Sequence, residues 1–145
     1  MRIRFRFQKL DIWKRAVEIG EKLFVIADEL EARKLYRYAE QLRGAGLSMS
    51  NNIAEGAGST SNREFGSFLN FAKRSAFENA NMVIMLARRG IISQSSCDEL
   101  LNDLHQECQM ITGFTRSLRR KATAKLTMLV CAGIGFSAFL LRLCL

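Results

Sequence analysis

Apolar side chains recur at helical spacing along most of the chain, in four successive segments. The first segment runs from about Asp11 to about Arg33, and its apolar stripe contains Trp13, Val17, Gly20, Leu23, Phe24, Ala27 and Leu30. The second covers roughly Tyr36 to Glu55, the third reaches from Ser61 to Arg89, and the fourth starts at Ser96. An apolar stripe opposite polar positions is typical of an amphipathic helix that buries one face.

The ends of these segments carry local signals. Ser61 with Glu64, and Ser96 with Glu99, fit capping boxes at helix N-termini. Gly56 and Gly58 suit the cap that ends the second helix, because glycine accepts a positive φ. Short connections make consecutive helices antiparallel. The absence of proline in all 145 residues favours long helices with few turns. We therefore predict an all-α fold: an antiparallel up-down-up-down four-helix bundle over residues 1–125 and an apolar helical tail over residues 126–145.

A polar row interrupts the second segment. It lies beside the apolar positions of that helix, and matching polar residues follow one helix later. A buried polar group without a hydrogen-bond partner costs a few kcal/mol, so such a row needs hydrogen-bond partners on the element that packs against it. We interpret it as a structural network that fixes the register of two helices, in preference to a catalytic centre. The predicted network contains Gln41, Ser48, Asn52, Glu55, Ser75 and Glu78.

The formal net charge of +8 at pH 7 indicates a kind of binding partner, because a basic surface favours polyanions such as nucleic acid or an anionic membrane face. The alternative is a mildly basic protein with nothing to bind. The first seven residues alternate arginine with apolar side chains, which fits a short extended arm. No signal peptide opens the chain, and its cysteines fit buried thiols in a reducing compartment, so we expect a cytoplasmic protein.

The residues that catalysis needs are scarce. His105 is the one histidine, and no E-x-x-H pair supplies ligands for a di-iron bundle. The four cysteines lack the paired spacing of a zinc site, and the glycine-rich stretch after Glu55 lacks a P-loop lysine. We expect no metal, no cofactor and no enzymatic activity.

The end of the chain poses a separate question. Leu126 to Leu141 contains no charge, and basic residues precede it. Basic residues before an apolar terminal segment fit a membrane anchor with the bundle in the cytoplasm, although sixteen residues are slightly short for a span. An oligomer contact and non-native sequence are the alternatives for residues 126–145.

Three blocks of sequence resemble a known bacterial family. They are FQKLDIWKRA from Phe7, QLRGAGLSMSNNIAEG from Gln41 and EFGSFLNFAKRSAFE from Glu64. The chain resembles the four-helix bundle proteins encoded by intervening sequences inside 23S rRNA genes. It is also similar to their relative, the accessory variability determinant of diversity-generating retroelements.

The resemblance implies a bundle that assembles as a ring of five. The retroelement relative binds nucleic acid and partners a reverse transcriptase, and binding to ribosomal RNA is the usual supposition for the rRNA-encoded members. Two departures stand out. Gly44 replaces a basic residue that often follows Arg43 in the family, and the proline that often separates the first two helices is absent.

From charge and resemblance together, we expect non-catalytic binding of structured nucleic acid through phosphate contacts. The alternative is an oligomeric scaffold that recruits a protein partner such as a reverse-transcriptase-like enzyme, with the tail as a membrane tether. The aromatic residues sit at core spacing, so no stacking platform for bases is expected. The candidate phosphate contacts are Arg2, Arg4, Arg6, Arg43, Arg63, Lys73, Arg74, Arg88, Arg89, Arg116, Arg119, Arg120 and Lys121.

Overall fold

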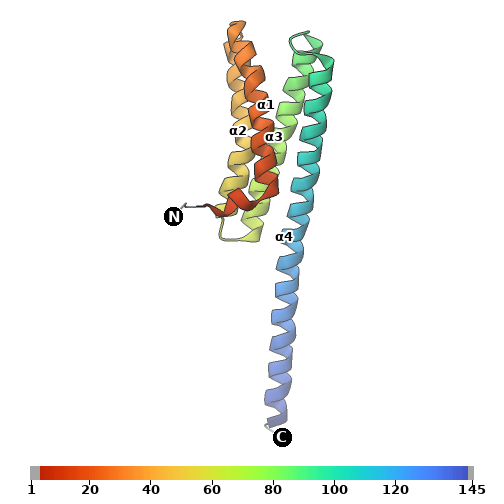
Figure 1. Cartoon of the computed structure of the whole chain (residues 1–145). Helices are drawn as coiled ribbons and strands as arrows, with labels where there is room; N and C mark the ends of the chain where they lie inside the picture. Colours follow the sequence, from red (N-terminus) through yellow and green to blue (C-terminus); the bar gives the residue numbers. More distant parts are fainter. Residues whose placement is uncertain (1–3, 144–145) are drawn as a thin grey trace.

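The computed structural model describes the backbone of residues 4–143 and the side chains of residues 4–120. A short 3-10 helix, η1 (Arg6–Lys9), leads into α1 (Asp11–Ala32), and α2 (Tyr36–Gly58), α3 (Asn62–Arg88) and α4 (Gln94–Leu143) follow. The four long helices run up, down, up and down, and α4 continues past the ends of the others (Figure 1). Over the described residues this is the all-α four-helix bundle that the apolar spacing predicts.

Contacts between helices follow the order of the chain. α2 packs against α1 and α3, and α4 packs against α3 and, much less, against α1. The described residues of α2 and α4 are not in contact. α1 and α4 are antiparallel. Arg15 pairs with Gln106, and Lys22, two turns later on α1, pairs with Glu99, two turns earlier on α4. Over the described residues, α4 therefore has fewer close neighbours on the other helices than α1, α2 or α3 has.

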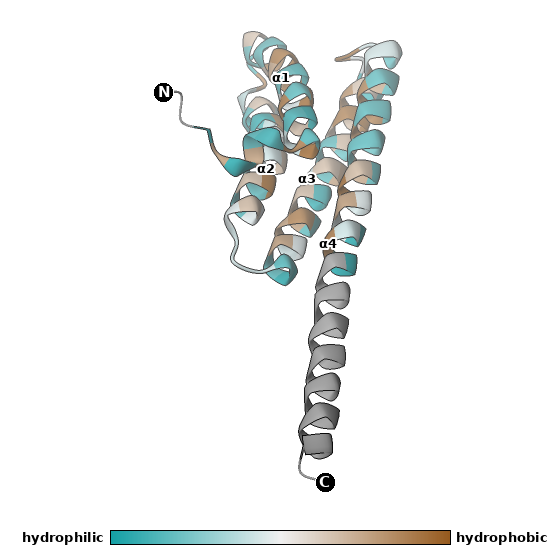
Figure 2. Cartoon of the chain, turned by 60° about the horizontal axis from the view of Figure 1, so that its bottom comes forward, coloured by the Kyte–Doolittle hydropathy of each residue, from teal (hydrophilic) through white to brown (hydrophobic). Residues whose placement is uncertain are grey.

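One stripe of each helix builds the core. Leu23 of α1, Met49 and Ile53 of α2, Leu69 of α3 and Leu104 of α4 are all fully buried. Hydrophobic and hydrophilic residues alternate around the helices instead of forming separate blocks along them (Figure 2). Burying such side chains stabilises each helix by roughly 1.5–3 kcal/mol per residue. This supplies most of the free energy that holds the helices together.

Two glycines allow α1 and α2 to approach closely. A Cβ atom placed on Gly20 would lie 3.7 Å from the carbonyl oxygen of Gly46, and one placed on Gly46 would lie 3.7 Å from the Cα of Gly20. The two backbones therefore come close at this crossing, where an added methyl group would make ordinary van der Waals contact with the facing helix. Gly46 costs helix propensity, about 1 kcal/mol relative to alanine.

The helix ends differ from the sequence expectations in three places. Ser61 caps α3 as predicted, since its hydroxyl accepts a hydrogen bond from the Glu64 N–H at 3.1 Å. α4, however, begins at Gln94 because Ser93 caps it, accepting from the Ser96 N–H at 3.1 Å. Gly56 has no positive φ and lies inside α2, so it does not end that helix. Arg6–Lys9 forms a 3-10 helix where an extended arm was expected.

Among the residues whose side chains are described, none of the helices has a stretch long and apolar enough to cross a membrane. The tail over residues 126–145, where the sequence analysis places a membrane anchor or an oligomer contact, lies outside the described side chains.

Candidate nucleic-acid interface

A basic groove runs along the seam between α3 and α4, beside the loop that joins α2 to α3. Its larger part has a volume of about 720 Å³ and lies between the first turns of α3 and residues 115–119 of α4. A second part, of about 260 Å³, continues up the same seam toward Lys73 and Thr112. Together, the two parts are lined by Asn62, Arg63, Gly66, Ser67, Leu69, Asn70, Phe71, Lys73, Ile111, Thr112, Thr115, Arg116, Leu118 and Arg119. We call this surface the α3–α4 groove.

Helical spacing places these residues on one face. On α3, Arg63, Asn70 and Lys73 follow each other at intervals of seven and three. On α4, Thr112, Thr115 and Arg119 follow each other at intervals of three and four, and so do Thr112, Arg116 and Arg119 at intervals of four and three. Residues at such intervals share one side of a helix. The two polar faces adjoin because the core residues next to them, such as Phe65 and Phe114, pack edge to face at 5.4 Å.

Four of the thirteen predicted cationic contacts meet in this groove: Arg63, Lys73, Arg116 and Arg119. No aspartate or glutamate belongs to its lining in the described part of the chain. Neither Arg63 nor Arg116 forms an ion pair with another described residue. The Lys73 ammonium donates to the Thr112 hydroxyl at 3.4 Å, which leaves most of its donor capacity open. Arg63 and Arg116 therefore present positive charge in the groove that no described carboxylate compensates.

The remaining candidates lie elsewhere. Arg4 and Arg6 are exposed at the N-terminal end, Arg88 and Arg89 are exposed at the far end of α3, and Arg120 is exposed on α4. Arg74 lines a neighbouring hollow on the α2 side of α3. Arg2 and the side chain of Lys121 lie outside the described residues.

Arg43 differs from the other candidates. Its guanidinium donates to Asp28 and Glu31 of α1, both at 2.5 Å. The hydrogen bond to Asp28, and next that to Glu31, raises the pKa of Arg43. Because two carboxylates already pair with this guanidinium, Arg43 is a structural link between α1 and α2, and the phosphate contact expected there stays a prediction.

The polar row of α2 reaches α3 through a smaller set than predicted. The Ser75 hydroxyl donates to the Ser48 hydroxyl at 3.0 Å, and the Asn52 amide donates to the Ser48 hydroxyl at 3.0 Å and to the Ser48 carbonyl at 2.7 Å. Gln41, Glu55 and Glu78 are exposed and form no hydrogen bond with the rest of the described chain. Their expected shielding from solvent is therefore wrong. Ser48, Asn52, Ser75 and Glu78 instead line an open hollow of about 500 Å³ with Phe71 and Arg74.

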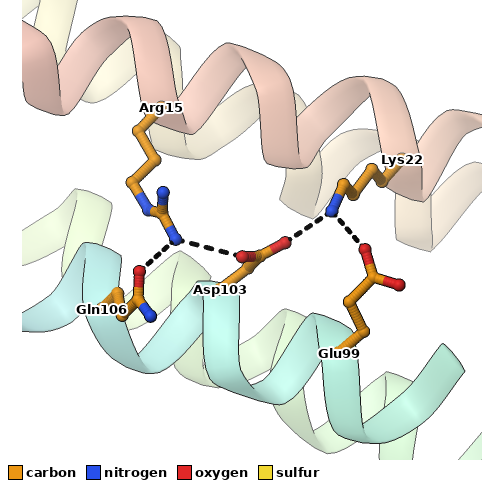
Figure 3. A network of polar contacts seen from close by, with 5 residues as sticks. All are labelled: Arg15, Lys22, Glu99, Asp103 and Gln106. Carbon is orange, nitrogen blue, oxygen red and sulfur yellow. Dashed lines mark hydrogen bonds and ion pairs between the residues drawn. The ribbon is translucent and has the colours of Figure 1, made fainter. Parts of the chain in front are cut away.

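The polar network that does join distant helices lies between α1 and α4 (Figure 3). Arg15 donates to Asp103 at 3.0 Å and to Gln106 at 2.6 Å, and Lys22 donates to Asp103 at 2.8 Å and to Glu99 at 2.5 Å. The hydrogen bonds to Asp103 and Glu99 raise the pKa of Lys22. This network compensates for the sparse apolar contact between the two helices, and the sequence analysis missed it.

A second feature that the sequence analysis missed is a buried carboxyl. Glu107 of α4 is 0% exposed, and neither of its carboxyl oxygens has a hydrogen-bond partner within the described residues. Burial raises its pKa to about 8, although the nearby Arg15 opposes that shift. The buried Oδ1 of Asn79 on α3 also accepts no hydrogen bond from any described residue. Glu107 follows Leu104 by three positions and precedes Ile111 by four, so spacing alone would have placed it in the core.

His105 offers no catalytic arrangement. It is exposed on α4, where one ring nitrogen shares a 2.9 Å hydrogen bond with Gln109. Across the described side chains, no group of histidine, cysteine and acidic residues converges in a way that could hold a metal ion.

The sequence pattern of the 23S rRNA-intervening sequence proteins matches residues 8–113. A crystal structure from the S23 ribosomal protein family of Bacteroides thetaiotaomicron, a protein of unknown function, has the same fold. The two share 20% sequence identity with a TM-score of 0.68, over 72% of this chain and 97% of that one. No curated protein matches the chain.

Proposed function

This chain belongs to the family of 23S rRNA-intervening sequence proteins, and from that premise we propose that it binds structured nucleic acid, of the ribosomal RNA type, through the α3–α4 groove. The role is binding without catalysis. The observation that carries the proposal is the convergence of Arg63, Lys73, Arg116 and Arg119 on one seam that no described acidic residue lines.

The chemistry of the groove suits a phosphate backbone. Arginine pairs with phosphate oxygens through two parallel N–H donors, and such charge-assisted hydrogen bonds are about twice as strong as neutral ones. The amide of Asn70 adds a neutral donor beside the cations, whereas the hydroxyls of Ser67 and Thr115 already donate to the backbone carbonyls of Arg63 and Ile111. Contacts of these kinds fix position on a nucleic acid and carry little sequence information. We therefore expect recognition by shape and charge.

The salt dependence of binding tests this proposal. For three phosphate contacts, from Arg63, Lys73 and Arg116, the logarithm of the association constant should fall with the logarithm of salt concentration with a slope of roughly −2 to −3. Affinity of the full chain for a ribosomal RNA fragment should then fall about 20- to 40-fold between about 50 and 200 mM salt. Duplex DNA serves as the comparison ligand. A slope near zero, or no binding at low salt, contradicts the proposal.

We further propose that the chain forms a homo-oligomer, with the ring of five that the family resemblance implies. In support, large apolar side chains remain exposed on α3 (Phe77, Ile84 and Met85) and on α2 (Leu47). In a ring, each groove would repeat around the assembly, so weak single sites would act together. Light scattering coupled to gel filtration measures the assembly mass, and a monomer at micromolar concentration contradicts this part.

A second candidate function is recruitment of a protein partner, such as a reverse-transcriptase-like enzyme. The same exposed apolar side chains favour it, since apolar surface left open on a monomer marks interaction sites. Binding of this kind depends little on salt. A partner that stays bound at about 200 mM salt while RNA dissociates would favour the scaffold over the RNA-binding role.

A further inference from the structure

Phe71 stands out on α3 because its aromatic ring is open to solvent at the edge of the basic groove. The side chain is 46% exposed, whereas Phe65, two turns earlier, is buried in the core. The ring of Phe68 lies edge to face against it, with ring centres 6.3 Å apart and planes at 76°. Phe71 is therefore held from one side while part of its surface remains free, contrary to the expectation that the aromatic residues of this helix belong to the core.

The surroundings of Phe71 leave room for a planar group. Phe71 lines the α3–α4 groove on one side and the hollow beside α2 on the other, so it forms the ridge between them. Gly66, about one turn away in the groove lining, has no side chain, and an added Cβ would meet nothing within 4 Å. The larger part of the groove, about 720 Å³, exceeds the size of a single nucleobase.

Polar and charged groups stand on both sides of this ridge. Arg63 lies in the groove and Arg74 in the hollow, and their separation of eleven positions corresponds to about 16 Å along the helix. Asn70, next to Phe71, is exposed in the groove lining and carries both a donor and an acceptor. A strand crossing α3 at Phe71 would thus meet a cation before the ring and another after it.

We propose that the groove receives an unpaired nucleotide, whose base stacks on the ring of Phe71 while Arg63 and Arg74 hold the flanking phosphates. The Asn70 amide then lies where it can hydrogen-bond an edge of the base. The ligand class is RNA with a bulged or looped nucleotide, in preference to a continuous duplex, whose bases are already stacked on one another. This inference rests on the proposed nucleic-acid binding and specifies its substrate.

The test compares two RNA hairpins that differ only in one bulged nucleotide, with the full chain and its Phe71→Ala and Phe71→Leu variants. Tyr36→Ala is the matched control, because Tyr36 is a 55% exposed aromatic residue of α2 outside the groove lining. The wild type should bind the bulged hairpin roughly 5- to 100-fold more tightly, and both Phe71 variants should lose this preference while still binding the paired hairpin. Tyr36→Ala should keep it. A 2-aminopurine base at the bulge should lose emission on binding to the wild type and not to Phe71→Leu.

Two results overturn the inference and leave nucleic-acid binding intact: equal affinity of the wild type for both hairpins, or an unchanged preference in Phe71→Ala. If the preference is unchanged and the assembly mass of Phe71→Ala differs from that of the wild type, Phe71 is a contact between copies. Failure of the wild type to bind either hairpin at low salt overturns both the inference and the proposed function.

Discussion

Glu107 gives the sharpest prediction about the stability of the bundle. Its carboxyl group is fully buried, none of the described residues donates a hydrogen bond to it, and its pKa is raised by burial from 4.5 to about 8. Between these two values the folded chain keeps a proton that the unfolded chain releases. Folding stability contributed by the neutral carboxyl is therefore complete below about pH 4.5 and is lost as the pH rises through about 8.

The size of the effect follows from the same shift. Each pH unit in this window costs up to 1.36 kcal/mol for one proton, so the loss across the window is on the order of 3–5 kcal/mol. Glu107→Gln has nearly the same shape and carries no titrating proton. Its free energy of unfolding should match that of the wild type near pH 5 and exceed it increasingly toward pH 9.

Urea unfolding followed by circular dichroism at pH 5, 6, 7, 8 and 9 measures the difference between the two proteins at each pH. Glu21→Gln, at an exposed position of α1, controls for the loss of one negative charge. A difference between Glu107→Gln and wild type that stays constant over this range would refute the reasoning, because it would mean that Glu107 is already ionised in the folded bundle at pH 5.

Further substitutions test the packing and the polar contacts. Gly56→Ala should destabilise the bundle by about 1–2 kcal/mol in urea unfolding, because the new methyl would press on the Phe65 ring and lie 2.9 Å from the Cβ of Phe68. Gly44→Ala should instead stabilise the bundle by up to ~1 kcal/mol, because nothing lies within 4 Å of the new methyl. Equal effects of the two substitutions would contradict this geometry. Asp103→Asn should lower the free energy of unfolding by roughly 1–2 kcal/mol, because it weakens the ion pairs with Arg15 and Lys22, and this loss should be smaller in 1 M salt. A loss that does not change with salt would contradict a role for ion pairing. Ser75→Ala should cost about 1 kcal/mol by removing the bond to Ser48 and should leave RNA affinity unchanged, so a large drop in affinity would assign this hydroxyl to the binding surface.

The helices themselves could be predicted because apolar spacing is a local property of the sequence. Gly20, Leu23, Ala27 and Leu30 of the predicted stripe are buried in the fold, whereas Trp13, Val17 and Phe24 are half-buried. The Ser61 cap forms as its spacing indicates. The start of α4 was missed because two serines, Ser93 and Ser96, both fit the cap, and only the backbone geometry selects Ser93.

The polar row shows where sequence reasoning ends. Spacing correctly places Ser48, Asn52 and Glu55 on one side of α2, but it does not give the angle at which α3 approaches. In the fold, α3 packs against only the edge of that side on which Ser48 lies. The Ser75 hydroxyl therefore reaches Ser48, while Glu55 remains exposed to solvent. The rotation of each helix about its axis is set by the core of the whole bundle.

The groove was beyond prediction for the same reason. Thirteen basic residues were equal candidates along the sequence, and only the packing of α3 on α4 brings Arg63, Lys73, Arg116 and Arg119 together. The pairing of Arg43 with Asp28 and Glu31 depends on how α1 crosses α2, which one sequence does not specify.

The most direct test of the central claim, that the α3–α4 groove binds nucleic acid, compares two charge-matched double variants of the full chain. Arg63→Ala with Arg116→Ala removes two groove cations, and Arg88→Ala with Arg89→Ala removes two from the far end of α3, about 37 Å along the helix from Arg63. With a ribosomal RNA fragment, the groove variant should lose roughly two units of salt slope and about 25- to 60-fold in affinity at 100 mM salt, while the far-end variant should stay close to wild type. Equal losses in the two variants would contradict the account, since they would show that net charge, and not the groove, holds the RNA.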